Sequence, residues 1–511
     1  MAGAESQFSQ RNGVPMKPNK LSWPAVGAAL AMVTLVACSS SGGESSADGQ
    51  VTLKWQGYSQ ERVGFYKEAA AEFKKEFPNI TVVPEALAED DYKQALPLSF
   101  RSKNSPDLFS YTWPTAGDYF ELTDVLGNNW AAPLDASVLP ADFKSRFRGT
   151  SDLMEPIYGK DGKIYTVPRP PSTGTIGYGY MYFNKDVLAK AGLTGNLPAT
   201  WDQFTAACQA IKEKAGASCI AQSTQSPDEI ERLLSTFVAV NVKGYTPSKV
   251  STQSGKFTET SDPQFVAAIQ YLRSLYEQKH VLPGQYDKIA ARQAVAGGKA
   301  AFYFDGGWMS TVFPETFKFK NFGVALPPAK TTAAPDGYAG RIPQGPPLPE
   351  LFISSQSKHP KEATQFLEWM TRPNGWYAQH FTEKGFDLLP WVAPDKAAQW
   401  LPKDNATRDL LPLDPKLHVL APVPALKCPD LAKSQALTKV DQIQENLVHS
   451  TINKFLLSGG DWPSMARSVE DKQNKVFEAE LGKEASAGLK VSTDCFAEPA
   501  WDGVTPFKYT K

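Results

Sequence analysis

The side chains most able to recognise a ligand are aromatic residues at the ends of predicted strands or after a Leu-Pro pair. Each presents a flat apolar ring, which can cover a flat apolar face of a bound molecule. Open parallel sheets bind ligands at the carboxyl ends of their strands, so this placement predicts a binding site. For each ring the alternative is packing in a core. The candidates are Tyr58, Tyr111, Trp113, Trp308 and Trp391.

Polar side chains that can hydrogen-bond the rim of a ligand lie near the same places. Asp305 precedes Trp308 closely, and Arg341 and Gln344 lie in a loop rich in glycine and proline. Asp91 lies in the first turn of a predicted helix, where a carboxylate also favours the positive end of the helix dipole. These four residues are candidate ligand contacts, and the dipole explanation stays open for Asp91.

No motif for catalysis, a cofactor or a metal accompanies these residues. The 5 histidines are widely spaced without an HExxH motif, and neither a GxSxG elbow nor a phosphate-binding Walker loop is present. We therefore expect a protein that is not an enzyme and has no cofactor. A secreted glycosidase is the alternative from another class. Its catalytic carboxylate pair is identified by the distance between the two groups in space, which a sequence does not show.

Charge and length exclude several classes of partner. The 511 residues carry 53 Lys and Arg against 54 Asp and Glu. Without a basic excess, the chain is not expected to bind nucleic acid. Its length is ample for two or three domains with large cores.

The N-terminus has the pattern of a secretory signal over residues 1–37. Basic residues precede a short apolar run that ends in Leu35-Val36-Ala37-Cys38. A transmembrane helix needs about 20 apolar residues, and this run is shorter. The ending resembles the lipobox of bacterial lipoproteins, which implies that Cys38 is acylated and anchors the mature chain to the cell membrane. A signal-anchor helix is the alternative. Residues 38–50 are rich in Ser and Gly and indicate a flexible linker.

The other cysteines indicate disulfides rather than a metal site. Cys208, Cys219, Cys428 and Cys495 are an even number in an oxidising compartment, and no CxxC spacing supports a metal. Cys208 and Cys219 are close in sequence, so we expect them to pair and leave Cys428 for Cys495. The sequence alone leaves the other two pairings open.

The periodicity of the chain predicts an α/β fold. Strand and helix patterns alternate over residues 51–111, which implies a parallel sheet with crossover helices. Further strands are expected at 175–184, 300–304 and 348–354. Two long helices are expected at about 434–457 and 463–484.

Six stretches in chain order resemble the family 1 extracellular solute-binding proteins of sugar ABC importers, the maltose-binding type. Each motif is weak alone, and together they span residues 51–390. The first four are FKKEFPNITV at 73–82, SPDL at 105–108, GKIYTVP at 162–168 and PATWDQF at 198–204. The fifth combines GKAAF at 298–302 with GGW at 306–308, and the sixth combines SKHPKEA at 357–363 with GFDLLP at 385–390.

The resemblance implies two lobes of the class II periplasmic-binding-protein type, each a mixed sheet flanked by helices, with several chain crossings at a hinge. The N-terminal lobe is expected over 51–168 and 335–371, and the C-terminal lobe over 175–326 and 374–511. The ligand is expected between the lobes, which close around it. Trp308 matches the family's tryptophan that stacks on sugar.

The resemblance also implies a function. The chain would capture a carbohydrate, a di- or oligosaccharide, and deliver it to two permease subunits driven by a cytoplasmic ATPase. We expect a monomer, outside the cytoplasm and held by its lipid. The alternative with the same fold is a receptor for a polyamine, a glycerophosphodiester or a peptide.

Overall fold

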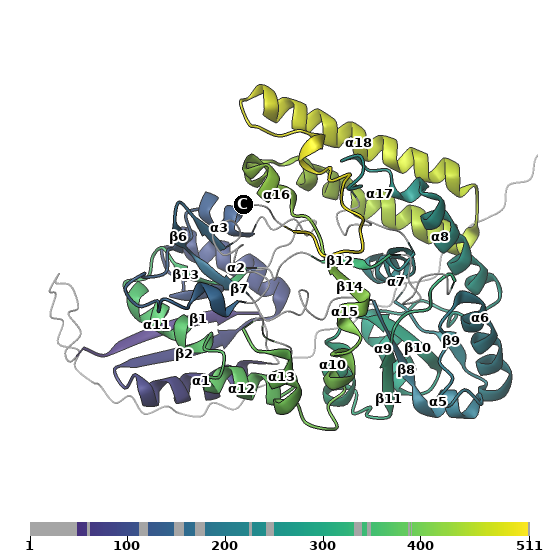
Figure 1. The fold of residues 1–511 in the computed structure, drawn as a ribbon, viewed down its shortest axis with the longest axis horizontal. Helices are drawn as coiled ribbons and strands as arrows, with labels where there is room; N and C mark the ends of the chain where they lie inside the picture. Colours follow the sequence, from purple (N-terminus) through teal and green to yellow (C-terminus); the bar gives the residue numbers. More distant parts are fainter. Residues whose placement is uncertain are drawn as a thin grey trace, which may run out of the picture. The chain divides into compact units, whose positions relative to one another are not determined.

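We describe the fold on a computed structural model (Figure 1). The chain divides into residues 1–47 and residues 48–511. The signal sequence, Cys38 and Trp113 lie outside the described residues. The described residues are 49–58, 62–111, 121–147, 158–168, 179–223, 227–241, 250–331, 340–344, 349–386, 389 and 391–508.

The first sheet is built from parallel strands joined by helices, as the alternation of patterns predicts. Strands β2 and β3 lie on either side of β1 and run parallel to it. A strand from much later in the chain, β13, pairs antiparallel with β3, β4 and β7. The strands are β1 Val51–Gly57, β2 Ile80–Ala86, β3 Leu108–Ser110, β4 Ala131–Ala132, β7 Thr166–Pro168 and β13 Pro349–Ser354.

The period of apolar residues fixes how these elements pack. In β1, Val51, Leu53 and Trp55 alternate with exposed residues, so one face is buried. In α1, Phe65, Ala69 and Phe73 recur every four residues and form one buried stripe. The helices here are α1 Val63–Glu76, α2 Glu89–Arg101 and α3 Glu121–Gly127, and a short hairpin joins β5 Gly159–Lys160 to β6 Lys163–Ile164.

The second sheet has the order β11-β8-β10-β9. Its strand β10 is buried along its whole length, because neighbouring strands lie on both sides and helices pack against its residues. The strands are β8 Tyr180–Asn184, β9 Ser218–Ile220, β10 Ala300–Asp305 and β11 Phe322–Ala325. The helices are α5 Lys185–Lys190, α6 Trp201–Ala210, α7 Pro227–Ala239, α8 Pro263–Glu277, α9 Lys288–Ala296 and α10 Met309–Thr316.

The chain after β13 contributes to both lobes. Tyr377 and Phe381 of α12 pack with Phe65 in the core of the first sheet. The boundary expected at residue 374 therefore differs from the packing, which places α12 and α13 with the first sheet. An amphipathic stripe shows that a helix is buried, but it does not show against which sheet. The helices are α11 Pro360–Met370, α12 Trp376–Glu383 and α13 Pro394–Trp400.

The C-terminal part adds a helical hairpin to the second lobe. Helices α17 and α18 run side by side, and Val448 and Ile452 of α17 join the core of the second sheet (Figure 1). No helix in the described part of the chain is long and apolar enough to cross a membrane. The elements are β12 Ile342–Gln344, α14 Thr407–Leu410, α15 Asp414–Leu417, β14 His418–Leu420, α16 Pro424–Lys427, α17 Ala436–Ser458 and α18 Trp462–Ser486.

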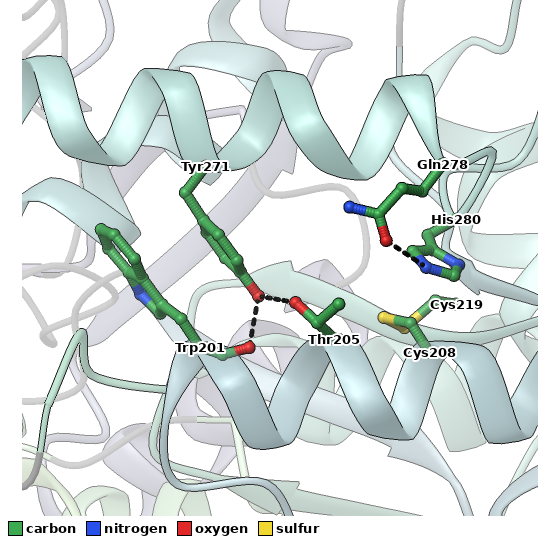
Figure 2. Close-up of a disulfide and its surroundings, with 7 residues drawn as sticks. All are labelled: Trp201, Thr205, Cys208, Cys219, Tyr271, Gln278 and His280. Atoms are coloured by element: carbon green, nitrogen blue, oxygen red, sulfur yellow. Dashed lines mark hydrogen bonds between the residues drawn. A yellow bond between two sulfur atoms is a disulfide. The ribbon is translucent and has the colours of Figure 1, made fainter.

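Both disulfides have the predicted pairing, Cys208 with Cys219 and Cys428 with Cys495. The first links α6 to β9 and is buried (Figure 2). Beside it, Tyr271 of α8 stacks on Trp201 with ring centroids 4.5 Å apart, and its hydroxyl donates to the Trp201 carbonyl oxygen at 2.8 Å. Helices α6 and α8 are thus joined by a ring stack and a hydrogen bond.

Candidate functional site

Trp308 lies in the turn between β10 and α10, on the second lobe. The indole ring is partly exposed and packs against the core of that lobe. Its ring lies against the Gly306 backbone so closely that a Cβ atom at position 306 would overlap it. Only glycine at 306 leaves room for the indole in this orientation.

Hydrogen bonds from two other elements hold the same turn. The Tyr182 hydroxyl of β8 lies 3.1 Å from the Gly306 carbonyl oxygen and 3.2 Å from that of Gly307. The Ser310 hydroxyl of α10 donates to the Gly307 carbonyl oxygen at 2.8 Å. The backbone that carries Trp308 is therefore held by hydrogen bonds from within the protein.

Asp305 holds the turn from within the lobe. Its carboxylate accepts the Gly306 N–H at 2.8 Å through Oδ1 and the Arg292 Nη2 of α9 at 2.7 Å through Oδ2. Burial alone would lower the pKa of Arg292, but Tyr303 and Asp305 outweigh it and raise that pKa. The side chain of Asp305 is 0% exposed, so its charge is compensated inside the protein.

On the first lobe, Tyr58 and Tyr111 follow the neighbouring parallel strands β1 and β3. Tyr92 of α2 ties these strand ends together, because its hydroxyl lies within hydrogen-bond distance of the Gln56 and Ser110 carbonyl oxygens. The rings of Tyr58 and Tyr92 lie 6.0 Å apart, and all three tyrosines belong to one cluster. The carboxyl edge of this sheet therefore carries grouped aromatic rings.

Asp91 directly precedes Tyr92 and is exposed in the first turn of α2. The residue before this helix, Ala88, has no side chain that could cap it. The carboxylate is therefore placed to favour the helix dipole, and it is open to solvent.

Comparison with known proteins places this architecture in a family. Residues 57–375, more than half of the chain, match the family model described as bacterial extracellular solute-binding protein. The chain belongs to this family. The two-lobed α/β fold is that of a solute-binding protein.

Individual relatives and a solved structure are also similar to this chain. The arabinooligosaccharide-binding protein of Bacillus subtilis is 23% identical over 371 residues, which are 70% of this chain and 78% of that protein. The multiple sugar-binding protein of Streptococcus mutans is 23% identical over 356 residues, 67% of this chain and 76% of that one. The GacH receptor of Streptomyces glaucescens, solved unliganded and with acarbose, has a TM-score of 0.59 at 20% identity and covers 84% of this chain and 98% of its own.

In this solute-binding protein Trp391 has the environment of a core residue. It is 3% exposed and belongs to the core of the first sheet. Its ring meets that of Phe147 edge-on, with centroids 5.9 Å apart. Trp391 is therefore not part of the proposed site.

Arg341 directly precedes the short strand β12, and Gln344 is the last residue of that strand. Arg341 is partly exposed, and the side chain of Gln344 lies outside the described part. Strand β12 pairs in parallel with β14, where Ile342 meets His418. Asp414 joins this pair of strands to the second sheet, because its Oδ1 lies 2.9 Å from the Tyr180 hydroxyl and 2.8 Å from His418 Nδ1.

Sequence reasoning missed the residues that hold the candidates in place. Tyr92, Tyr182 and Arg292 bond the backbone or carboxylate beside Tyr58, Tyr111 and Trp308. In the sequence they resemble ordinary members of a helix or strand. Their partners are distant along the chain or belong to the backbone, so no spacing rule would find them.

A cavity of about 440 Å³ lies elsewhere on the first lobe. It is lined by Glu72, Glu76, Arg372 and Trp376, among others. Glu72 and Glu76 lie at the C-terminal end of α1, which leads into β2, and thus near the amino ends of the parallel strands; Arg372 follows α11, and Trp376 begins α12. The cavity is therefore separate from the strand ends that carry the tyrosines. Among the described residues, no group of His, Cys, Asp and Glu could hold a metal ion.

Proposed function

We propose that this protein captures an oligosaccharide between its two lobes and delivers it to an ABC importer. The observation that carries the proposal is the placement of aromatic rings at strand ends in both lobes. Tyr58 and Tyr111 follow strands of the first sheet, and Trp308 follows β10 of the second. A sugar presents C–H faces that such rings can cover and a rim of hydroxyls that polar groups can bond.

The relatives support this class of ligand. The names of two of them refer to arabinooligosaccharides and multiple sugars, and the receptor with a similar fold was solved with acarbose. In the proposed site Tyr58, Trp113 and Trp308 cover ring faces, while Asp91, Arg341 and Gln344 bond hydroxyls. Tyr111 is only 7% exposed and lies in the cluster against which Tyr58 packs, so it supports Tyr58 from behind. Asp305 acts on the ligand through the turn that it holds.

The remaining parts of the proposal concern delivery. The protein binds as a monomer outside the cytoplasm, held at the membrane by acylated Cys38 and the linker over 38–50. It hands the sugar to two permease subunits served by a cytoplasmic ATPase. No bond in the sugar is broken, which a labelled oligosaccharide recovered unchanged after incubation would support.

A thermal-shift screen of the purified protein tests the ligand class. The panel holds arabinotriose, acarbose, maltose and raffinose, with spermidine, glycerophosphocholine and a tripeptide as alternatives. A ligand that binds only the folded state stabilises it by RT ln(1 + [L]/Kd). We expect an increase in Tm with a sugar. An increase only with one of the other solutes would keep the fold and reject the carbohydrate.

Replacement of Trp308 tests the proposed contact. Trp308→Ala should weaken sugar binding by about 1–3 kcal/mol, the scale for losing one large side chain from a buried contact, measured under conditions in which circular dichroism shows the variant to be folded. Isothermal titration measures the affinity. Trp376→Ala is the control, because Trp376 is also partly exposed but lines the separate cavity. An affinity unchanged by Trp308→Ala would remove this residue from the site.

A further inference from the structure

A buried ion pair lies directly behind the turn that carries Trp308. Arg292 Nη2 and Asp305 Oδ2 are 2.7 Å apart, with side chains 12% and 0% exposed. Removing two charges from water costs several kcal/mol for each ion, so a buried pair is weak evidence for a gain in stability. Such a pair can instead specify one local conformation.

The geometry of this pair identifies the conformation that it specifies. Asp305 uses one oxygen for Arg292 and the other for the Gly306 N–H. Arg292 also donates from Nε to the Tyr303 hydroxyl at 3.2 Å. The guanidinium is thus held by two residues of β10, and it orients the carboxylate toward the next peptide.

The orientation of Trp308 depends on that peptide. The indole lies against Gly306, which joins two peptides. The Asp305–Gly306 peptide carries the N–H that Asp305 accepts, and the Gly306–Gly307 peptide carries the carbonyl that Tyr182 holds. If the Asp305 carboxylate turned away, the Gly306 N–H would lose its acceptor and the peptide could rotate. The indole would then lose the flat surface against which it lies.

We propose that Arg292 is a positioning residue for ligand binding, which acts through Asp305 and the Gly306 peptide to fix the face that Trp308 presents. The inference rests on the proposed function, because the bound sugar is what Trp308 would contact. Arg292 itself does not contact the sugar. The planar guanidinium suits this role better than an ammonium group, because it reaches Tyr303 and Asp305 in one fixed geometry.

A double-mutant cycle tests the proposal with acarbose and arabinotriose as probes. Arg292→Met should weaken binding about tenfold in the presence of Trp308, within the range for coupled neighbours. In the Trp308→Ala background the same change should weaken binding by less than about twofold. Equal losses in both backgrounds would overturn the proposal, because they would show that Arg292 does not act through Trp308.

Hydrogen exchange of the ligand-free protein gives a second measurement. The amides of residues 306–312 should exchange faster in Arg292→Met than in wild type. Arg273→Met is the matched control, since Arg273 pairs with Glu277 at 2.9 Å and bonds the Leu456 carbonyl on other elements. It should leave exchange at 306–312 and sugar affinity unchanged. Unaltered exchange in Arg292→Met would overturn the proposal.

Two further outcomes are distinguishable. If Arg292→Met does not fold, Arg292→Lys keeps the buried charge and loses the fork, and it should show a smaller change in the same cycle and the same amides. If wild type binds neither probe nor any other sugar, the proposed function fails together with the role of Arg292 in binding. In that case, hydrogen exchange of the amides of residues 306–312 shows only whether Arg292 stabilises the turn.

Discussion

At the residue scale, burial decides between two uses of the same side chain. Asp305 has the residue type and position of a ligand contact, yet its carboxylate is enclosed and bonded by Arg292 and Gly306. Trp391 is likewise enclosed in the first core, while Trp308 stays partly exposed. Residue type gives the chemistry that is available, and the surroundings determine whether a ligand can use it.

A buried histidine makes the stability of the protein depend on pH. His280 is 1% exposed, and its Nε2 lies 3.2 Å from the Gln278 Oε1 (Figure 2). Burial and the nearby Lys212 lower the pKa of His280 below its ordinary value of 6.5. Below pH 6.5 the unfolded chain takes up a proton that the folded protein does not bind, so stability falls as the pH falls through this window.

Urea unfolding at pH 7.5 and pH 5.5 measures this effect. The wild-type free energy of unfolding should fall more over this interval than that of His280→Gln, whose side chain does not titrate. The fall measured for His280→Gln gives the contribution of all the other titratable groups and is therefore the control. An equal fall in the two proteins would show that His280 does not contribute.

At the element scale, buried carboxylates of α18 bond the residues just before α17 and just before α8. Glu484 near the end of α18 accepts the Ser434 hydroxyl at 2.6 Å and the Gln435 N–H, just before α17 begins. The free N–H groups at a helix start need such an acceptor. Glu470, which lies earlier in α18, accepts hydrogen bonds from the Thr260 hydroxyl at 2.7 Å and from the Ser261 N–H at 2.8 Å.

Removing the carboxylate at the start of α17 should destabilise the protein. Glu484→Ala leaves buried donors without their acceptor and should lower the free energy of unfolding by about 1–3 kcal/mol. Chemical denaturation with helical circular dichroism gives the value. Glu478→Ala on the same helix is the control: Glu478 is 44% exposed and pairs with Lys256, so its loss should cost less than about 1 kcal/mol. Similar effects of the two changes would contradict the assignment.

At the scale of the whole molecule, the chain after the matched family region is secured by a disulfide and local packing. Cys428 and Cys495 join segments on either side of the α17–α18 hairpin, separated by 67 residues. Leu431, Leu437 and Phe477 pack in the same cluster as Cys495. The end of the chain then returns to β14, where the Phe507 N–H donates to the Leu420 carbonyl oxygen.

Loop length predicts which disulfide matters more. The Cys428–Cys495 bridge closes a longer loop than Cys208–Cys219, whose residues are separated by 11. In the chain-entropy model, Cys428→Ala/Cys495→Ala should cost about 4 kcal/mol and Cys208→Ala/Cys219→Ala about 3 kcal/mol. Differential scanning calorimetry of both double variants tests the order. A larger loss from the short loop would show that local strain or packing outweighs loop entropy.

The sequence by itself determined features that depend on local pattern. Apolar spacing predicted α1 and β1, cysteine spacing predicted the Cys208–Cys219 bridge, and motif order predicted the family and its two-lobed fold. The helix, the strand and the short bridge follow from nearby residues, because strand and helix periods and short loop closures are local properties. The family follows from the order of short motifs along residues 51–390.

Only the tertiary structure decided which partners each element and side chain found. It placed α12 and α13 on the first sheet, enclosed Trp391, and turned Asp305 toward Arg292 and Gly306. Tyr92 and Tyr182 acquired their roles in the same way, through backbone oxygens on other elements. Such contacts join residues distant in sequence, and their energies depend on burial and geometry that no local pattern encodes.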